Sequence, residues 1–189
     1  MKKGFTILEL LVSISIMATI TVLVTANLAA GNRSVELRSA TDNLASLIRK
    51  ASVWSLVGHQ INGQFPIGGY GVSIPACAAP PCKVTLFADL DGSLTYNSAG
   101  NLLNTPVSTQ VDERVEDLAM GNFMSLVPPG QGIDLLFKPP QPTVCRFDRA
   151  NLACPPVGTI TIGLVQVNVT SAGTKNIDIS PTTGQITVR

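Results

Sequence analysis

Residues 1–12 read MKKGFTILELLV, and this stretch decides how the N-terminal part of the chain folds. Two lysines precede a Gly-Phe pair, and an apolar run follows that contains one charged side chain, Glu9. Positions 10–32 hold no charged residue, and about 20 mainly apolar residues are enough to cross a bilayer. An ionised side chain near the start of such a run is unfavourable unless it has a partner. We therefore expect Glu9 to serve a function.

Two simpler interpretations explain the run less well. A secretory signal peptide has an apolar core of roughly 7–15 residues followed by a small-x-small cleavage site, whereas this run is longer and no such site ends it. A plain membrane anchor explains the length and the positive flank of Lys2 and Lys3. It does not explain Glu9, nor the Gly4-Phe5 junction placed ahead of the apolar run.

Residues 4–12, GFTILELLV, resemble the N-terminal signature of type IV prepilins and type II secretion pseudopilins. In that family a membrane peptidase cuts after the glycine and methylates the new N-terminus. The resemblance implies cleavage between Gly4 and Phe5, N-methylation of Phe5, and a role in assembly for Glu9. It implies as partners the prepilin peptidase, other pilin or pseudopilin subunits in a homo- or hetero-polymeric filament, and an inner-membrane assembly platform. The implied location is a single-pass inner-membrane protein with a periplasmic globular domain, which then enters an extracytoplasmic filament.

Elementary electrostatics gives Glu9 a role that fits this resemblance. Cleavage would create a positive α-amino group at Phe5, and Glu9 of one chain could face that amine on a neighbouring chain. The attraction between two such charges is much stronger in hydrocarbon than in water. Because neither charge is stable there alone, their pairing would select the axial register between subunits.

The apolar run continues into an amphipathic helix. Apolar side chains recur there at steps of three or four and form one stripe: Leu37, Ala40, Leu44, Leu47, Ile48, Ala51 and Trp54. Gly58 is a suitable helix end, so the pattern predicts one helix from about Phe5 to Val57. At Gly31-Asn32 a local bend and an uninterrupted helix remain equally open.

After Gly58 the pattern changes to period two, with glycine, proline and asparagine between the runs, which predicts strands. The expected fold is therefore α+β, a long N-terminal helix packed on an antiparallel β-rich domain. We divide the chain into a leader (1–4), a membrane or filament-core half of the helix (5–30), an amphipathic half (31–57) and a globular domain (58–189). The segment from Asp112 to Asp117 could be a short helix or an exposed strand. The expected strands are Gly71–Ile74, Lys83–Ala88, Phe123–Val127, Ile133–Phe137, Thr143–Phe147, Thr159–Asn168, Asn176–Ile179 and Gln185–Val188.

The four cysteines lie in two local pairs, Cys77 with Cys82 and Cys145 with Cys154. Four cysteines allow three connectivities, and the short separations favour these two pairs. Disulfides of this kind persist in the periplasm or outside the cell. Free thiols and a zinc site are the alternatives, but the usual Cys-x2–4-Cys spacing of a zinc site is met by the first pair alone.

Composition excludes some functions. The formal net charge is +1, and removal of the two leader lysines would bring the side-chain total to −1. DNA binding through bulk charge is not expected, because nucleic-acid-binding domains carry a strong basic excess. Arg146 and Arg149 form a close basic pair beside the second cysteine pair and are the candidate nucleic-acid contacts. No hydrolase, metalloprotease or phosphate-binding motif is present, and His59 has no evident catalytic partner, so no enzyme and no cofactor is expected.

Asp89-Leu90-Asp91-Gly92 resembles the start of a calcium loop. The sixth loop position is Leu94 where glycine is required, and no acid occupies the twelfth position. The sequence therefore favours a hairpin turn with Asp-Gly at its tip, and Asp89 and Asp91 are the candidate ligands if calcium binds.

These features predict a structural subunit of a type IV pilus or type II secretion pseudopilus. The layout resembles the minor branch of the family, in particular minor pseudopilin H and its pilus counterparts. One alternative is a minor pilin that binds a ligand, for example DNA during uptake. A membrane-anchored enzyme is the remote alternative.

Overall fold

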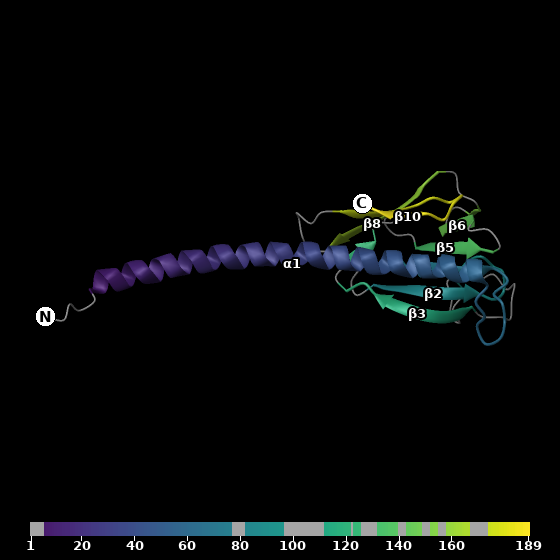
Figure 1. The fold of residues 1–189 in the computed structure, drawn as a ribbon, viewed down its shortest axis with the longest axis horizontal. Coiled ribbons are helices and arrows are strands. Elements are labelled where there is room, and N and C mark those ends of the chain that lie inside the picture. Colours follow the sequence, from purple (N-terminus) through teal and green to yellow (C-terminus); the bar gives the residue numbers. More distant parts are fainter. Residues whose placement is uncertain are drawn as a thin grey trace. The chain divides into compact units, whose positions relative to one another are not determined.

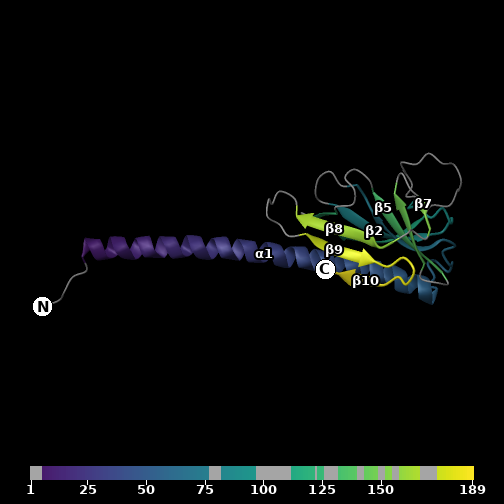
Figure 2. The same ribbon diagram turned by 90° about the horizontal axis from the view of Figure 1, so that it is seen from above.

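A computed structural model describes residues 6–76, 82–96, 112–121, 123–125, 132–139, 143–148, 152–154, 158–166 and 174–189. Within these residues the chain forms one long helix followed by short strands. It separates into two compact units, Met1–Glu36 and Leu37–Arg189. Figures 1 and 2 show the elements that make up each unit.

The helix α1 spans Ile7–Val57 and belongs to both units. Helical backbone continues through Gly31 and Asn32, so the uninterrupted helix is the correct alternative. In the first unit the large apolar side chains are exposed all round the helix, for example Leu11 at 63% and Leu23 at 65%. This half therefore has no core of its own.

The C-terminal end of α1 is closed by Gly58, as its sequence predicted. Gly58 has a φ of 68°, a left-handed conformation that glycine adopts without steric cost. The N–H of His59 then donates to the carbonyl of Trp54 at 3.1 Å. This six-to-one hydrogen bond is that of a Schellman motif and satisfies a carbonyl in the last helical turn.

Two antiparallel sheets follow. The larger has the strand order β3-β2-β1-β5-β6-β7 and the smaller has the order β10-β9-β8-β4. Every pairing in both is antiparallel, which confirms the predicted α+β class. The strand bounds are β1 Gly69–Ile74, β2 Lys83–Asp89, β3 Glu113–Ala119, β4 Phe123–Ser125, β5 Ile133–Lys138, β6 Thr143–Asp148, β7 Leu152–Ala153, β8 Ile160–Gln166, β9 Lys175–Ile179 and β10 Ile186–Val188.

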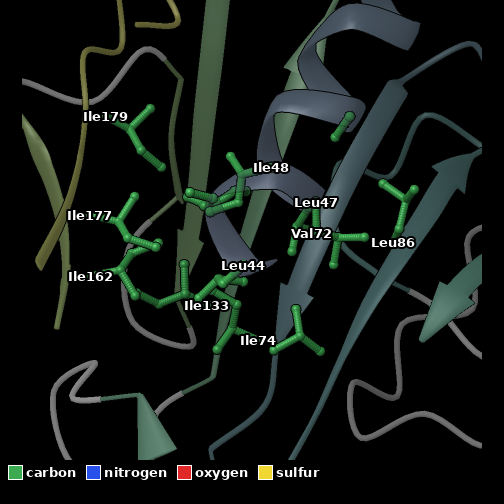
Figure 3. Close-up of a cluster of buried hydrophobic side chains, with 14 of the residues drawn as sticks. Leu44, Leu47, Ile48, Val72, Ile74, Leu86, Ile133, Ile162, Ile177 and Ile179 are labelled. Atoms are coloured by element: carbon green, nitrogen blue, oxygen red, sulfur yellow. The ribbon is translucent and has the colours of Figure 1, made fainter. Parts of the chain in front are cut away.

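The second half of α1 shares one apolar core with both sheets. Leu44 and Ile48 of the helix are fully buried, in the same cluster as Val72 of β1 and Ile162 of β8. Figure 3 shows these side chains converging from the helix and from both sheets. Burying a side chain of this size contributes about 1.5–3 kcal/mol. The apolar stripe predicted from the sequence is therefore the face of the helix that packs against both sheets.

Polar contacts fix the helix against the sheets at its C-terminal end. The buried hydroxyl of Ser55 donates to the carbonyl of Phe137 at the end of β5. Lys50 forms an ion pair with Glu116 of β3 and lies 4.7 Å from the centre of the Trp54 ring. These contacts set the position of α1 along the sheet, because each needs a particular register.

β3 resolves the alternative that the sequence left open. The segment beginning at Glu113 is a strand, and it forms an edge of the larger sheet. Its charged side chains suit an edge, where charge discourages pairing with another chain. The two-residue strand β7 was not predicted. The end of the predicted strand Phe123–Val127 and that of Thr159–Asn168 lie outside the described residues.

Candidate functional site

The N-terminal end of α1 is built around Thr6 and Glu9. The N–H of Glu9 donates to Oγ1 of Thr6 at 3.3 Å, and the N–H of Thr6 donates to Oε2 of Glu9 at 3.4 Å. The hydroxyl of Thr6 also donates to this Oε2 at 3.4 Å. Reciprocal bonds between the residue before a helix and its third residue form a capping box. Glu9 therefore stabilises the helix start of its own chain.

This arrangement provides one favourable location for the Glu9 charge. A carboxylate in the first turn interacts favourably with the positive end of the helix dipole. Glu9 is nevertheless exposed, so its second oxygen is accessible to a cation from another molecule. Gly4 and Phe5 lie outside the described residues, and their predicted cleavage and methylation stay predictions.

Hydroxyl side chains in the apolar half are satisfied within the helix. Ser13 donates to the carbonyl of Glu9 at 2.7 Å, Thr21 to that of Met17 at 2.8 Å, and Thr25 to that of Thr21 at 2.9 Å. Such bonds remove most of the cost of placing a hydroxyl in an apolar medium. The segment Ile7–Thr25 has a mean hydropathy of 2.4 and none of it is buried. It is long and apolar enough to cross a membrane.

A group of acidic residues lies at the end of β2. Carboxylate oxygens of Asp89, Asp91 and Asp112 lie within 4.8 Å of one another. Asp89 is completely buried and Asp112 nearly so. Asp89 fits only because residue 68 is glycine, since an added Cβ there would lie 1.8 Å from its Oδ2. The structure thus adds Asp112 to the two acids singled out from the sequence.

These carboxylates organise the chain that follows β2. Asp89 accepts the N–H of Gly92 at 2.7 Å through Oδ1 and the N–H of Leu94 at 2.9 Å through Oδ2. Asp91 accepts the N–H of Ser93 at 2.8 Å, and Asp112 accepts that of Leu90 at 3.3 Å. Leu94 has a φ of 67°, an uncommon conformation for a leucine, and this bond to Asp89 supports it.

The pKa values of Asp89 and Asp91 are shifted in opposite directions. Burial, followed by a hydrogen bond with Asp91, raises the pKa of Asp89 to about 6. The pKa of Asp91 is lowered; burial opposes this shift, and the hydrogen bonds with Ser93 and Asp89 outweigh it. As the pH falls, Asp89 therefore takes up a proton before Asp91 does, and its protonated carboxyl donates a hydrogen bond to the Asp91 carboxylate.

This geometry corrects one expectation from the sequence. The Asp91-Gly92 pair is a local turn bound by Asp89, but it is not the tip of a tight hairpin, because the strand that pairs with β2 begins at Glu113. The three carboxylates offer the oxygen ligands that calcium prefers. Their oxygens also accept backbone N–H groups, so the chain itself organises this loop, and Asp89 and Asp91 stay the candidate ligands named from the sequence.

One of the two predicted disulfides is described. Cys145 on β6 is bonded to Cys154, just after β7, so the bond ties together the two strands at that edge of the sheet. Cys82 is also disulfide-bonded. Its predicted partner, Cys77, lies outside the described residues, and that pairing stays a prediction.

The remaining residues singled out from the sequence are His59, Arg146 and Arg149. His59 is exposed and stacks on Trp54 with ring centres 4.3 Å apart. Arg146 is half-buried with a buried Nε, which is unlike a side chain extended toward phosphates. Arg149 lies outside the described residues.

Sequence reasoning missed two of these positions for different reasons. Thr6 could have been found, because a threonine three residues before a glutamate at the start of an apolar run is the signature of a capping box. Asp112 could not have been found, because it follows Asp91 by 21 residues. Only the return of the chain into β3 brings the two together.

Comparison with known proteins finds one match, and it lies at the N-terminus. Residues 1–25 match the model of the prokaryotic N-terminal methylation motif. This match supports the resemblance to type IV pilins and pseudopilins. No curated protein and no solved structure matches the chain.

Proposed function

We propose that this chain, which carries the N-terminal methylation motif of type IV pilins and pseudopilins, is a minor structural subunit of a type IV pilus or type II secretion pseudopilus. Prepilin peptidase removes residues 1–4 and methylates Phe5. The subunit then waits in the inner membrane with its β-rich domain in the periplasm. It enters the filament from there through its N-terminal helix.

The observation that carries the proposal is an exposed apolar helix whose first turn holds a single carboxylate. Between Ile7 and Thr25 no side chain is buried, so this surface must be covered by lipid or by other helices. Glu9 is the one charged residue in that segment. A bare carboxylate in hydrocarbon is costly, which favours contact with a positive group in either setting.

The capping box adds a step to the assembly hypothesis. Before assembly, Glu9 is held by Thr6 of its own chain. During assembly, the amine of Phe5 on a neighbouring subunit binds the same carboxylate. Because an ion pair is far stronger than the long hydrogen bonds of the cap in a medium of low dielectric constant, the neighbour's amine outcompetes Thr6.

Substitutions at Thr6 and Glu9 separate the charge from the cap. Glu9→Gln keeps a side chain that can complete a capping box but removes the charge. Thr6→Ala removes the cap but keeps the charge. We expect Glu9→Gln to be processed normally and yet fail to enter filaments, and Thr6→Ala to assemble, because it keeps the charge that binds the neighbour's amine. The measurement is the fraction of mature subunit found in sheared filaments, with mass spectrometry of its N-terminus.

Glu36→Gln is the matched control, because Glu36 lies on the same helix, is exposed, and falls outside the apolar segment. It should assemble like the natural chain. Normal assembly of Glu9→Gln would show that the charge has no role. Mature protein that still begins at Met1 would overturn the assignment to a processed subunit.

A further inference from the structure

A two-residue turn follows the end of α1. Ile61 and Gln64 form an isolated antiparallel bridge, with hydrogen bonds of 3.0 Å and 2.9 Å between their backbones. The residues between them, Asn62 and Gly63, have φ angles of 51° and 77°. Two positive φ angles in a row are characteristic of a type I′ turn, for which Asn-Gly is the preferred pair.

This turn leaves the Asn62 amide next to an accessible backbone nitrogen. Both residues are exposed, and nothing lies within 4 Å of the position that a Cβ of Gly63 would occupy. The hydrogen bonds that close the turn use the backbone of Ile61 and Gln64, not the N–H of Gly63. Glycine also gives this nitrogen the greatest backbone freedom of any residue.

We propose that Asn62 is a site of spontaneous deamidation in the folded protein. The backbone nitrogen of Gly63 loses its proton to solvent base and attacks Cγ of Asn62. An N–C bond forms, the Cγ–Nδ2 bond breaks, and ammonia leaves, which produces a succinimide. Water then attacks one of the two carbonyl carbons of the succinimide and breaks its bond to nitrogen. The products are aspartate or isoaspartate, and the reaction needs no oxidant or cofactor.

The fold makes this reaction local. The bridge between Ile61 and Gln64 lies outside both sheets, so opening it disrupts no strand pairing. The reaction needs a brief departure from the type I′ geometry. The single bridge between Ile61 and Gln64 opposes that departure only weakly. Asn43 lies within α1 and Asn176 within β9. Their backbones are held in regular structure, so the same attack is blocked.

The product changes the charge of this surface. The stretch from Ala51 to Cys82 contains no aspartate, glutamate, lysine or arginine. It exposes large apolar side chains, including Phe65 at 60% and Ile67 at 71%. Deamidation places one carboxylate beside them, and isoaspartate adds a backbone carbon that spoils the register of the turn. The inference does not depend on the proposed filament role.

The test follows the full-length protein in detergent during incubation in mildly alkaline buffer. Peptide mapping by mass spectrometry reports conversion at each asparagine, and ion exchange separates the acidic form. We expect an acidic form to accumulate that co-elutes with Asn62→Asp, with conversion at Asn62 and none at Asn43 or Asn176. Circular dichroism verifies that the protein stays folded throughout.

Two results would overturn the proposal. In one, Asn62 converts no faster than Asn43 and Asn176. In the other, it converts only in a sample unfolded with urea. Asn62→Gln provides the variant control, because its longer side chain cannot form the five-membered ring readily, and it should not yield the acidic form.

Discussion

The two halves of α1 both contain leucines but meet different surroundings. Leu23 is 65% exposed, whereas Leu44 is completely buried against both sheets. The first half is apolar all round, and the second carries apolar residues on one stripe. Hydrophobicity alone therefore does not locate a core. An apolar stripe on one side identifies the half of the helix that the β-rich domain covers, whereas apolar residues all round identify the half that lipid or other helices must cover.

The largest expected effect tests this contrast directly. Leu44→Ala should destabilise the domain by about 3 kcal/mol, because it leaves a cavity in a core that includes both sheets. Leu23→Ala should change the same free energy of unfolding by less than about 0.5 kcal/mol. Urea unfolding followed by the fluorescence of the single tryptophan, Trp54, measures both. Equal effects would refute the division of the helix.

A smaller effect is expected where the helix meets the sheet through a polar contact. Ser55→Ala removes the bond to the carbonyl of Phe137 and should cost about 1–2 kcal/mol, since a buried acceptor is left unpaired. Ser46→Ala is the matched control, because Ser46 is exposed on the same helix. The intrinsic helix preference changes equally in both, so the difference between their unfolding free energies isolates the contact.

The smallest effect concerns pH and belongs to the second unit. The pKa of Asp89 is raised to about 6 in the folded protein from its ordinary value of 3.8. The folded state therefore binds a proton more tightly than the unfolded state, so this group makes the domain more stable as pH falls from about 7 toward 4. The lowered pKa of Asp91 opposes the trend and keeps it small.

Unfolding curves at several pH values measure whether the domain becomes more stable as the pH falls. Asp89→Asn should reduce the stabilisation on acidification and leave the part that comes from Asp134, whose pKa burial also raises, whereas Asp42→Asn, on the exposed face of the helix, should retain all of it. A natural chain that loses stability steadily between pH 7 and pH 5, with the same loss in Asp89→Asn, would contradict the assignment to Asp89.

Much of this fold was predictable from local patterns. The helix, its end at Gly58 and most strands follow from periodicity and turn residues, which act over a few positions. β3 was ambiguous because an edge strand needs no apolar alternation and its charges fit a helix equally well. The two-residue β7 is too short to leave any pattern. Asp112 depends on the path of the chain between two strands, and no local signal encodes that path.

The continuity of α1 has a mechanical consequence. A helix that runs from Ile7 to Val57 without a proline passes axial tension from turn to turn through its backbone hydrogen bonds. A pull on the apolar end is therefore delivered to the contacts of the second half, the buried cluster around Leu44 and Ile48 and the hydrogen bond of Ser55. Because many contacts share this force, each of them bears only a part of it.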